Sequence, residues 1–316
     1  MAAPSIAEPI VQNLTQDLDL SHEALTRVLD LAAQVKRTPL RFAQSLSGRY
    51  LSLLFEKPSL RTRMTFELAI KQLGGDSVTV AGPIDGREPV KDVARNLERW
   101  TQCIVARVFS HATIEELARW VRVPVINALS DLYHPCQALA DVQTIKEHFG
   151  RFDGLKLAFV GDGNNVAHSL MLTAGRLGMH VAVATPPGYE PSPEITSTSR
   201  RLGKITVTND PREAVSGAHV VYTDVWASMG QESEANARQK SFEAYQVNEA
   251  LFSQARADAI FMHCLPAKRG EEVTDGVIES LTCQSAPSCS RLTGGHISPA
   301  RAEKAVPAPR IGLKLK

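Results

Sequence analysis

The sequence lacks long apolar runs, paired cysteines and a strong net charge. No stretch approaches the roughly 18 apolar residues that span a bilayer, and no basic segment followed by an apolar core opens the chain, so neither membrane insertion nor secretion is expected. The net charge is +1, which gives no reason to expect a nucleic acid or a membrane surface as partner. The five cysteines form no Cys-x-x-Cys pair and no zinc spacing. Reduced thiols in a cytoplasm, without a metal site, are expected.

Length and patterning indicate two domains of the α/β class. The chain has 316 residues, 43% of them hydrophobic and 22% charged, as in a globular protein with a sizeable core. Short apolar runs alternate with amphipathic stretches, which predicts parallel sheets. We expect strands near residues 51–55, 78–80, 103–109, 123–127, 155–160, 180–184, 220–224 and 259–263, and helices over 21–32, 91–100 and 166–177. The prediction is two doubly wound parallel-sheet domains of similar size, at residues 1–146 and 147–280.

Residues 55–63 form the most informative local pattern. An apolar run ends at Phe55, Pro58 interrupts it, and Ser59 to Arg63 open a segment with apolar residues near helical spacing. Unpaired N–H groups and the helix dipole favour an anion at such a helix start, and arginine adds a planar fork that matches phosphate oxygens. The pattern predicts a phosphate cradle. The alternative is an ordinary capped helix with solvated arginines.

Polar residues follow several expected strands in the second half. Asn165, Asp224 and Cys264 each fall where a strand ends, the place where doubly wound sheets bind ligands. The segment 161–165 is similar to a dinucleotide-binding turn. It lacks the third glycine and an acidic ribose ligand about 20 residues later, so no nucleotide cofactor is expected.

Three further segments accompany residues 59–63. They are His134 to Asp141, Asp224 to Glu232, and His263 to Pro266. Alone, any one of these residues is more often a core or surface group than a ligand. Together, the four segments closely resemble the carbamoyltransferase family, from about residue 8 to residue 280. The first two are shared with relatives that use other amines, whereas the Asp-x-x-x-Ser-Met-Gly and His-Cys-Leu-Pro segments point to the ornithine enzymes.

The resemblance implies transfer of the carbamoyl group of carbamoyl phosphate to L-ornithine, giving L-citrulline and phosphate, in a cleft between the domains. No metal and no organic cofactor are implied. The reaction needs a phosphate clamp, a polarised carbonyl and a positioned neutral amine. By resemblance, the first domain binds carbamoyl phosphate and the second binds ornithine. The implied carbamoyl phosphate-binding residues are Ser59, Leu60, Arg61, Thr62, Arg107, His134, Gln137, Cys264 and Leu265.

Individual roles also follow from the resemblance. Arg107 would reach both phosphate and carbonyl oxygen, and His134 would donate to the carbonyl oxygen. Gln137 and the carbonyl of Leu265 would accept from the carbamoyl NH2 group. Leu60 departs from the threonine common in the family, so a backbone contact is retained there and a hydroxyl contact is lost.

The implied ornithine-binding residues are Asn165, Asp224, Ser228 and Met229, and the catalytic residues are Arg107, His134, Asp224 and Cys264. The attacking amine has an ordinary pKa near 10.4 and must lose a proton. A thiolate or a carboxylate could accept it, and the sequence leaves the base open. A Cys beside a His also raises covalent catalysis. Neighbouring residues on a strand point to opposite faces, which argues against that route for His263 and Cys264.

The resemblance stops near residue 280. The family continues with a Glu-Asn-Arg segment and a long helix, whereas residues 281–316 have neither. This stretch has six Lys or Arg against one acid, hence a charge of +5 that leaves −4 for the rest. We expect it to be an atypical, disordered tail. Arg291 could replace the family's arginine, but nothing around it supports this. Loss of that arginine and helix is expected to lower rate and stability.

Two further expectations concern assembly and alternatives. In the family, the loop equivalent to residues 81–88 reaches the active site of a neighbouring subunit, which implies a homotrimer; the alternative is a plain surface loop. The alternative functions are a transcarbamoylase for another amine, such as acetylornithine or aspartate, and a catalytically impaired homologue that only binds carbamoyl phosphate.

Overall fold

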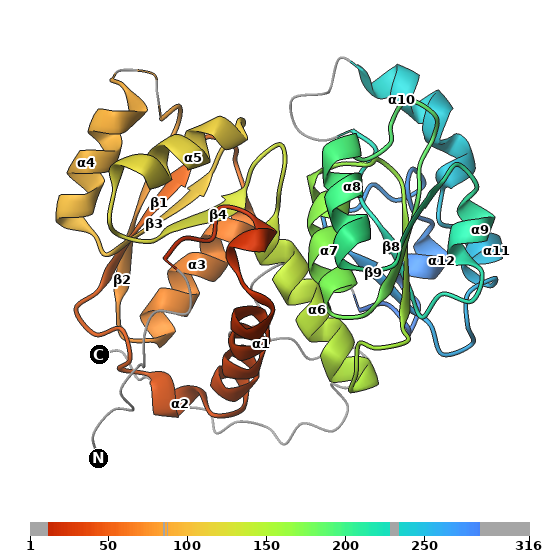
Figure 1. Cartoon of the computed structure of the whole chain (residues 1–316), viewed down its shortest axis with the longest axis horizontal. Helices are drawn as coiled ribbons and strands as arrows, with labels where there is room; N and C mark the ends of the chain where they lie inside the picture. The colour runs from red at the N-terminus through yellow and green to blue at the C-terminus, as the bar shows by residue number, and fades with distance from the viewer. Residues whose placement is uncertain (1–11, 85, 87, 228–233, 285–316) are drawn as a thin grey trace, which may run out of the picture.

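The chain forms two parallel β-sheets, each flanked by helices (Figure 1). This computed structural model describes residues 12–84, 86, 88–227 and 234–284. In that part of the chain, no helix is both long enough and apolar enough to cross a membrane.

The first sheet has the strand order β2-β1-β3-β4. Its strands are β1 (Tyr50–Phe55), β2 (Asp76–Ala81), β3 (Cys103–Arg107) and β4 (Val125–Leu129). The accompanying helices are η1 (Asp17–Asp19), α1 (His22–Arg37), α2 (Pro39–Phe42), α3 (Leu60–Gln72), α4 (Val90–Trp100), α5 (His111–Trp120) and α6 (Pro135–Phe149). Leu53 and Leu54 of β1 point to opposite faces and are both buried, in separate core clusters. Helices on both faces explain why the sequence of β1 is apolar apart from Ser52.

The second sheet has the order β7-β6-β5-β8-β9. Its strands are β5 (Lys156–Val160), β6 (His180–Ala184), β7 (Ile205–Thr208), β8 (Val220–Thr223) and β9 (Ile260–His263). Its helices are α7 (Asn165–Arg176), α8 (Pro193–Leu202), α9 (Pro211–Val215), α10 (Ala235–Phe242), η3 (Glu243–Tyr245), α11 (Glu249–Phe252) and α12 (Asp275–Ile278). The predicted class, two parallel-sheet α/β domains, is confirmed. The predicted strand 103–109 is too long, because β3 ends at Arg107.

The first helix helps to join the two domains. Leu25 and Leu29 of α1 share one apolar core cluster with Ile145 of α6 and Leu157 of β5. Ser21 caps α1 by accepting the N–H of Ala24, a contact typical of helix starts. Helix α1, which precedes the first sheet in the chain, therefore packs in one core with α6 and the second sheet.

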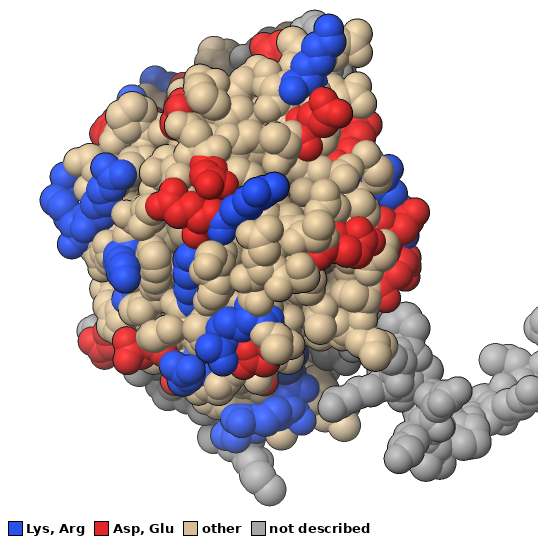
Figure 2. Space-filling model, turned by 90° about the vertical axis from the view of Figure 1, so that its right-hand side faces the viewer, with Lys and Arg blue, Asp and Glu red and all other residues tan. Residues whose placement is uncertain are grey.

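The outer edge of β9 is covered by residues 281–284. The Phe261 N–H donates to the carbonyl of Thr282, and the Gln284 N–H donates to the carbonyl of Phe261. This described start of the stretch expected to be a tail is thus hydrogen-bonded to the second sheet, while residues 285–316 lie outside the described part. On the face of the second domain seen in Figure 2, acidic and basic side chains are interspersed, without a large patch of one sign.

Candidate active site

In both sheets, predicted site residues lie at the carboxyl ends of the strands. In each sheet, successive strands are first added on one side of the first strand and then on its other side. This reversal falls between β1 and β3 in the first sheet and between β5 and β8 in the second. Ligands of doubly wound sheets bind at the carboxyl ends of strands near this reversal. Ser59 follows β1, and Arg107 is the last residue of β3. Asn165 follows β5, and Asp224 follows β8.

The expected phosphate cradle lies at the start of α3. The Ser59 hydroxyl accepts the N–H of Thr62 at 3.3 Å and donates to the Thr62 hydroxyl at 2.9 Å. Leu60 is 78% exposed, so its side chain extends into solvent and only its backbone N–H can contribute to the cradle. Arg63 pairs with Glu67 one turn later at 2.8 Å. Of the two guanidiniums, Arg61 therefore remains the one available to the cradle.

Arg107 is a buried cation at the end of β3. Burial lowers its pKa to about 10, although the nearby Cys264 and Asp224 act in the opposite direction. It therefore stays charged at neutral pH. Its Nε atom is buried and has no hydrogen-bond partner among the described residues. A residue of the first domain thus presents a charged, incompletely bonded group next to two residues of the second.

His134 precedes the first turn of α6 and is also buried. Burial, and then the charge of Arg107, lower its pKa to about 3. The imidazole is therefore neutral at working pH and can donate one N–H. Its backbone N–H donates to the Ser169 hydroxyl of α7 at 2.9 Å, while its Nδ1 has no partner in the described chain.

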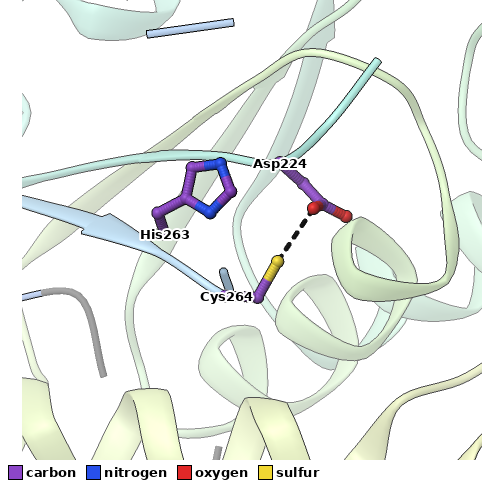
Figure 3. A group of neighbouring side chains, drawn as sticks. All are labelled: Asp224, His263 and Cys264. Carbon is purple, nitrogen blue, oxygen red and sulfur yellow. Dashed lines mark hydrogen bonds between the residues drawn. The ribbon is translucent and has the colours of Figure 1, made fainter. Parts of the chain in front are cut away.

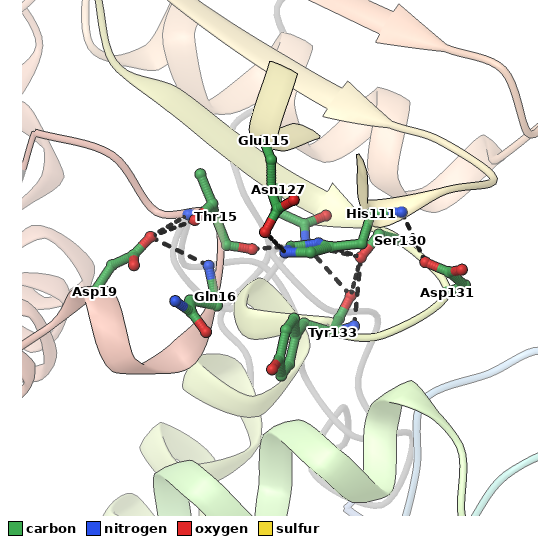
Figure 4. A network of polar contacts seen from close by, with 9 residues as sticks. All are labelled: Thr15, Gln16, Asp19, His111, Glu115, Asn127, Ser130, Asp131 and Tyr133. Carbon is green, nitrogen blue, oxygen red and sulfur yellow. Dashed lines mark hydrogen bonds and ion pairs between the residues drawn. The ribbon is translucent and has the colours of Figure 1, made fainter. Parts of the chain in front are cut away.

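A polar network holds the loop between β4 and α6 that leads to His134 (Figure 4). The Ser130 hydroxyl lies 3.0 Å from His111 Nδ1 and accepts from Asn127 Nδ2 at 3.1 Å and from the Tyr133 N–H at 3.3 Å. Asn127 Nδ2 also donates to the carbonyl of Thr15 at 2.8 Å. Because these bonds converge on one loop, they hold the segment that leads to His134.

The opposite side of the site comes from β8 and β9 (Figure 3). The Cys264 thiol donates to Asp224 Oδ1 at 2.8 Å. Asn164 Nδ2 donates to Asp224 Oδ2 at 2.8 Å, and Asn165 Nδ2 donates to the Ser130 carbonyl of the first domain at 2.6 Å. Burial and Asp224 raise the pKa of Cys264 well above its usual value. The cysteine is therefore a neutral thiol.

His263 has both ring nitrogens engaged. Nδ1 accepts the Leu265 N–H at 2.8 Å, so Nε2 carries the proton and faces the buried Glu272 carboxylate at 3.2 Å. Donor atoms of Asp224, His263 and Cys264 lie within 4.8 Å of one another. The argument from strand alternation is thus wrong, because β9 ends at His263 and Cys264 lies beyond it. These bonds nevertheless leave the imidazole neither a metal ligand nor a base for the thiol.

The structure brings together five of the residues that the sequence suggested. Arg107, His134, Asn165, Asp224 and Cys264 lie at the junction of the two domains. Gln137 is buried on α6 and Leu265 directly follows Cys264. Ser228 and Met229 lie outside the described residues. Sequence reasoning missed Asn164, although an Asn preceding a helix is a recognisable cap. It also missed the buried Asp17 and Ser169, which carry no local signal.

The comparisons with known proteins agree with this geometry. Residues 12–147 match the family model described as aspartate/ornithine carbamoyltransferase, carbamoyl-P binding domain, and residues 153–286 match the corresponding Asp/Orn binding domain. The ornithine carbamoyltransferase of Anoxybacillus flavithermus is 50% identical over 273 residues, which cover 83% of this chain and 87% of that protein.

Solved structures of carbamoyltransferases have a similar fold. The ornithine carbamoyltransferase from Pyrococcus furiosus superposes with a TM-score of 0.87 at 42% identity, covering 92% of this chain and 96% of that one. An acetylornithine transcarbamylase complexed with acetylcitrulline superposes with a TM-score of 0.80 at 28% identity, covering 90% and 96%. The chain belongs to the aspartate/ornithine carbamoyltransferase family.

Proposed function

We propose that this protein transfers the carbamoyl group of carbamoyl phosphate to the side-chain amine of L-ornithine, giving L-citrulline and phosphate. The observation that carries the proposal is the meeting of Arg107 and His134 from the first domain with Asp224 and Cys264 from the second. A cation and a neutral imidazole face a carboxylate and a thiol. These groups suit an acyl transfer from an anionic donor to an amine that binds as a cation and loses its proton before attack.

Carbamoyl phosphate is proposed to lie against the first domain. The start of α3, with Ser59, Arg61 and Thr62, holds the phosphate, and Leu60 contributes its backbone N–H. Arg107 bridges phosphate and carbonyl oxygen, and the neutral His134 donates to that oxygen as negative charge develops on it. Two acceptors, the Gln137 amide oxygen and the Leu265 carbonyl, take the hydrogens of the carbamoyl NH2 group.

Ornithine is proposed to lie against the second domain. Asn165, Asp224, Ser228 and Met229 hold it, and Cys264 positions the attacking amine. Asp224 is already bonded by the Cys264 thiol and by Asn164. Its carboxylate stabilises the charged amine, while the proton must leave before attack. The base is left unassigned. The proposed binding roles involve no metal and no organic cofactor.

Citrulline formation by the purified chain tests the reaction, with aspartate and acetylornithine as parallel acceptors. Turnover with ornithine alone is expected. Turnover only with another acceptor would replace ornithine as the substrate. Binding of carbamoyl phosphate without turnover would mean that the protein is a binding homologue, as expected if the sequence beyond residue 280 removed a needed arginine.

Two arginines of α3 provide a matched pair of variants. Arg61→Ala should raise the KM for carbamoyl phosphate by about 100-fold, because it removes a charge-assisted hydrogen bond. Arg63→Ala removes the same charge from a side chain paired with Glu67 and should change that KM less than about threefold. Equal effects would contradict the proposed cradle.

We further propose a homotrimer acting in the cytoplasm, in arginine biosynthesis or in the reverse, catabolic direction. Val78 and Val80, 57% and 51% exposed, line one face of the edge strand β2 just before the loop 81–88. An exposed apolar edge is a common subunit contact. Light scattering should give three chains for the parent and for Leu202→Lys, a change at an exposed leucine of α8, but one chain for Val78→Lys. A monomeric, fully active parent would rule out the trimer.

A further inference from the structure

Gln137 and Asp141 form a buried pair on α6. They are separated by one helical turn, so their side chains lie on the same face. Gln137 Nε2 donates to Asp141 Oδ1 at 2.9 Å. The two residues are 1% and 2% exposed, respectively. Water therefore does not compete for this bond, and each polar atom must find its partner inside the protein.

An ionised carboxylate only accepts hydrogen bonds, whereas a primary amide has one accepting and one donating end. Asp141 therefore draws the Nε2 end of the Gln137 amide toward itself. The Oε1 end must then point the other way. Asp141 in this way selects one of two amide orientations that are nearly equal in shape.

The surroundings of Asp141 favour its role as an acceptor. Tyr222 of β8, fully buried, lies close enough that Asp141 raises the pKa of its hydroxyl, which is raised chiefly by burial. Cys264 raises it as well. A protonated phenol beside the carboxylate offers a second donor group. Gln137 of α6 and Tyr222 of β8 thus both present donors to Asp141.

We propose that Asp141 is a positioning residue that holds the Gln137 amide oxygen toward the carbonyl substituent of the donor, and so selects an amide over a methyl ketone. This inference rests on the proposed function, in which Gln137 faces the carbamoyl NH2 group. With the amide reversed, two NH2 groups would face each other. A donor that bears a methyl group there, such as acetyl phosphate, would leave the buried Oε1 atom unpaired, which sites of this kind reject strongly.

Two stable ligands isolate this selection. Phosphonoacetamide and acetonylphosphonate share a phosphonate and a carbonyl and differ only in an NH2 group against a CH3 group. The ratio of their dissociation constants, measured by calorimetry on the full chain, cancels any general effect on phosphonate binding. The parent should favour the amide by at least about tenfold, since an unsatisfied buried acceptor costs about 1–3 kcal/mol.

Four variants test the role of Asp141. Asp141→Asn offers a donor as well as an acceptor, so the preference for the amide should fall about tenfold. Gln137→Glu places two carboxylates together and should weaken both ligands. The double variant Gln137→Glu/Asp141→Asn exchanges the two functions at constant charge, since the amide now donates from position 141 and the carboxylate accepts at position 137. It should restore the preference to within about threefold of the parent. Thr144→Val, which removes a hydroxyl bonded to Ala140 on the same helix, should retain the preference.

The outcomes separate this inference from the proposed function. An unchanged ratio in Asp141→Asn, or a double variant no more selective than Asp141→Asn, would overturn the positioning role, even if the parent forms citrulline. A parent that forms no citrulline but prefers the amide, with restoration in the double variant, would overturn the proposed reaction and retain the role of Asp141. No preference in the parent would overturn the inference.

Discussion

The Ser169 hydroxyl donates to the buried carboxylate of Asp17 at 2.6 Å and accepts the backbone N–H of His134 at 2.9 Å. Thr173 Oγ1 donates to the same carboxylate at 2.8 Å, and Arg176 donates to the Asp17 carbonyl at 2.7 Å. A turn near the start of the chain is thereby bound to α7 and, through one hydroxyl, to the start of α6. The placement of His134 depends on this contact between distant segments.

Asp17 should give the protein a measurable pH dependence of stability. Burial raises its pKa to about 6, against the lowering effect of Ser169, Thr173 and Arg176. Because the folded pKa lies above the unfolded one, the folded state holds the proton longer. The free energy of unfolding from this group therefore falls as pH rises from about 4 to about 6.

The loss over the full interval is about 3 kcal/mol, at about 1.4 kcal/mol per pKa unit. In Asp17→Asn this loss should disappear. Urea unfolding at pH 4.5 and pH 7 measures it: the parent should lose about 2 kcal/mol more than the variant between the two values. Asp30→Asn changes an exposed carboxylate of α1 and serves as the control. Parallel pH profiles for the parent and Asp17→Asn would contradict the prediction.

His134 should act as a neutral donor. Its pKa of about 3, set by burial and Arg107, means that no protonation step of this residue falls between pH 5 and pH 8. His134→Ala removes the donor and should lower kcat by about 10²–10³. His134→Asn keeps a neutral N–H and should lose less. The acidic limb of the kcat/KM profile should be the same in the parent and in His134→Asn; a limb that disappears in the variant would show that His134 titrates.

Cys264 should not be an acylated nucleophile. Its thiol is bonded to Asp224, and burial together with that carboxylate raises its pKa, whereas a nucleophilic cysteine needs a lowered one. Cys264→Ala should therefore retain turnover, with a KM for ornithine raised about tenfold. Mass spectrometry of the parent quenched during turnover checks the route. Complete inactivity of the variant, together with a carbamoylated thiol in the parent, would establish covalent catalysis.

The sequence predicted those parts of the fold and site that have local signals. The strand runs at residues 51–55 and 155–160 are apolar except for Ser52 and Lys156, because both faces of each sheet are covered, and both are confirmed as β1 and β5. The short strand β7, with all four residues partly buried at a sheet edge, has no such run and was missed. Side-chain directions could not be predicted from periodicity, because they depend on contacts. The direction of Arg63 depends on its ion pair with Glu67. The proximity of His263 to Cys264 depends on where β9 ends.

Arg238 of α10 should be a main support of the second half of the site. Its guanidinium donates to Asp162 and to the carbonyl of Trp226, each at 2.9 Å, and to the exposed Glu234 at 3.0 Å. Asp162 is itself buried, and burial raises its pKa to about 6 although Arg238 opposes this. Arg238→Ala leaves that carboxylate buried without a cation, which should cost about 3–5 kcal/mol at pH 8.

The cost should be smaller at pH 5, because without Arg238 the pKa of Asp162 rises further and the carboxyl takes up a proton before the protein unfolds. Urea unfolding at the two pH values tests this. Glu234→Gln removes only the exposed partner and should cost less than about 1 kcal/mol at either pH. Arg238→Met/Asp162→Asn, which removes both buried charges, should recover most of the stability. If Arg238→Ala cost no more than Glu234→Gln, the buried pair would not be the support that its geometry indicates.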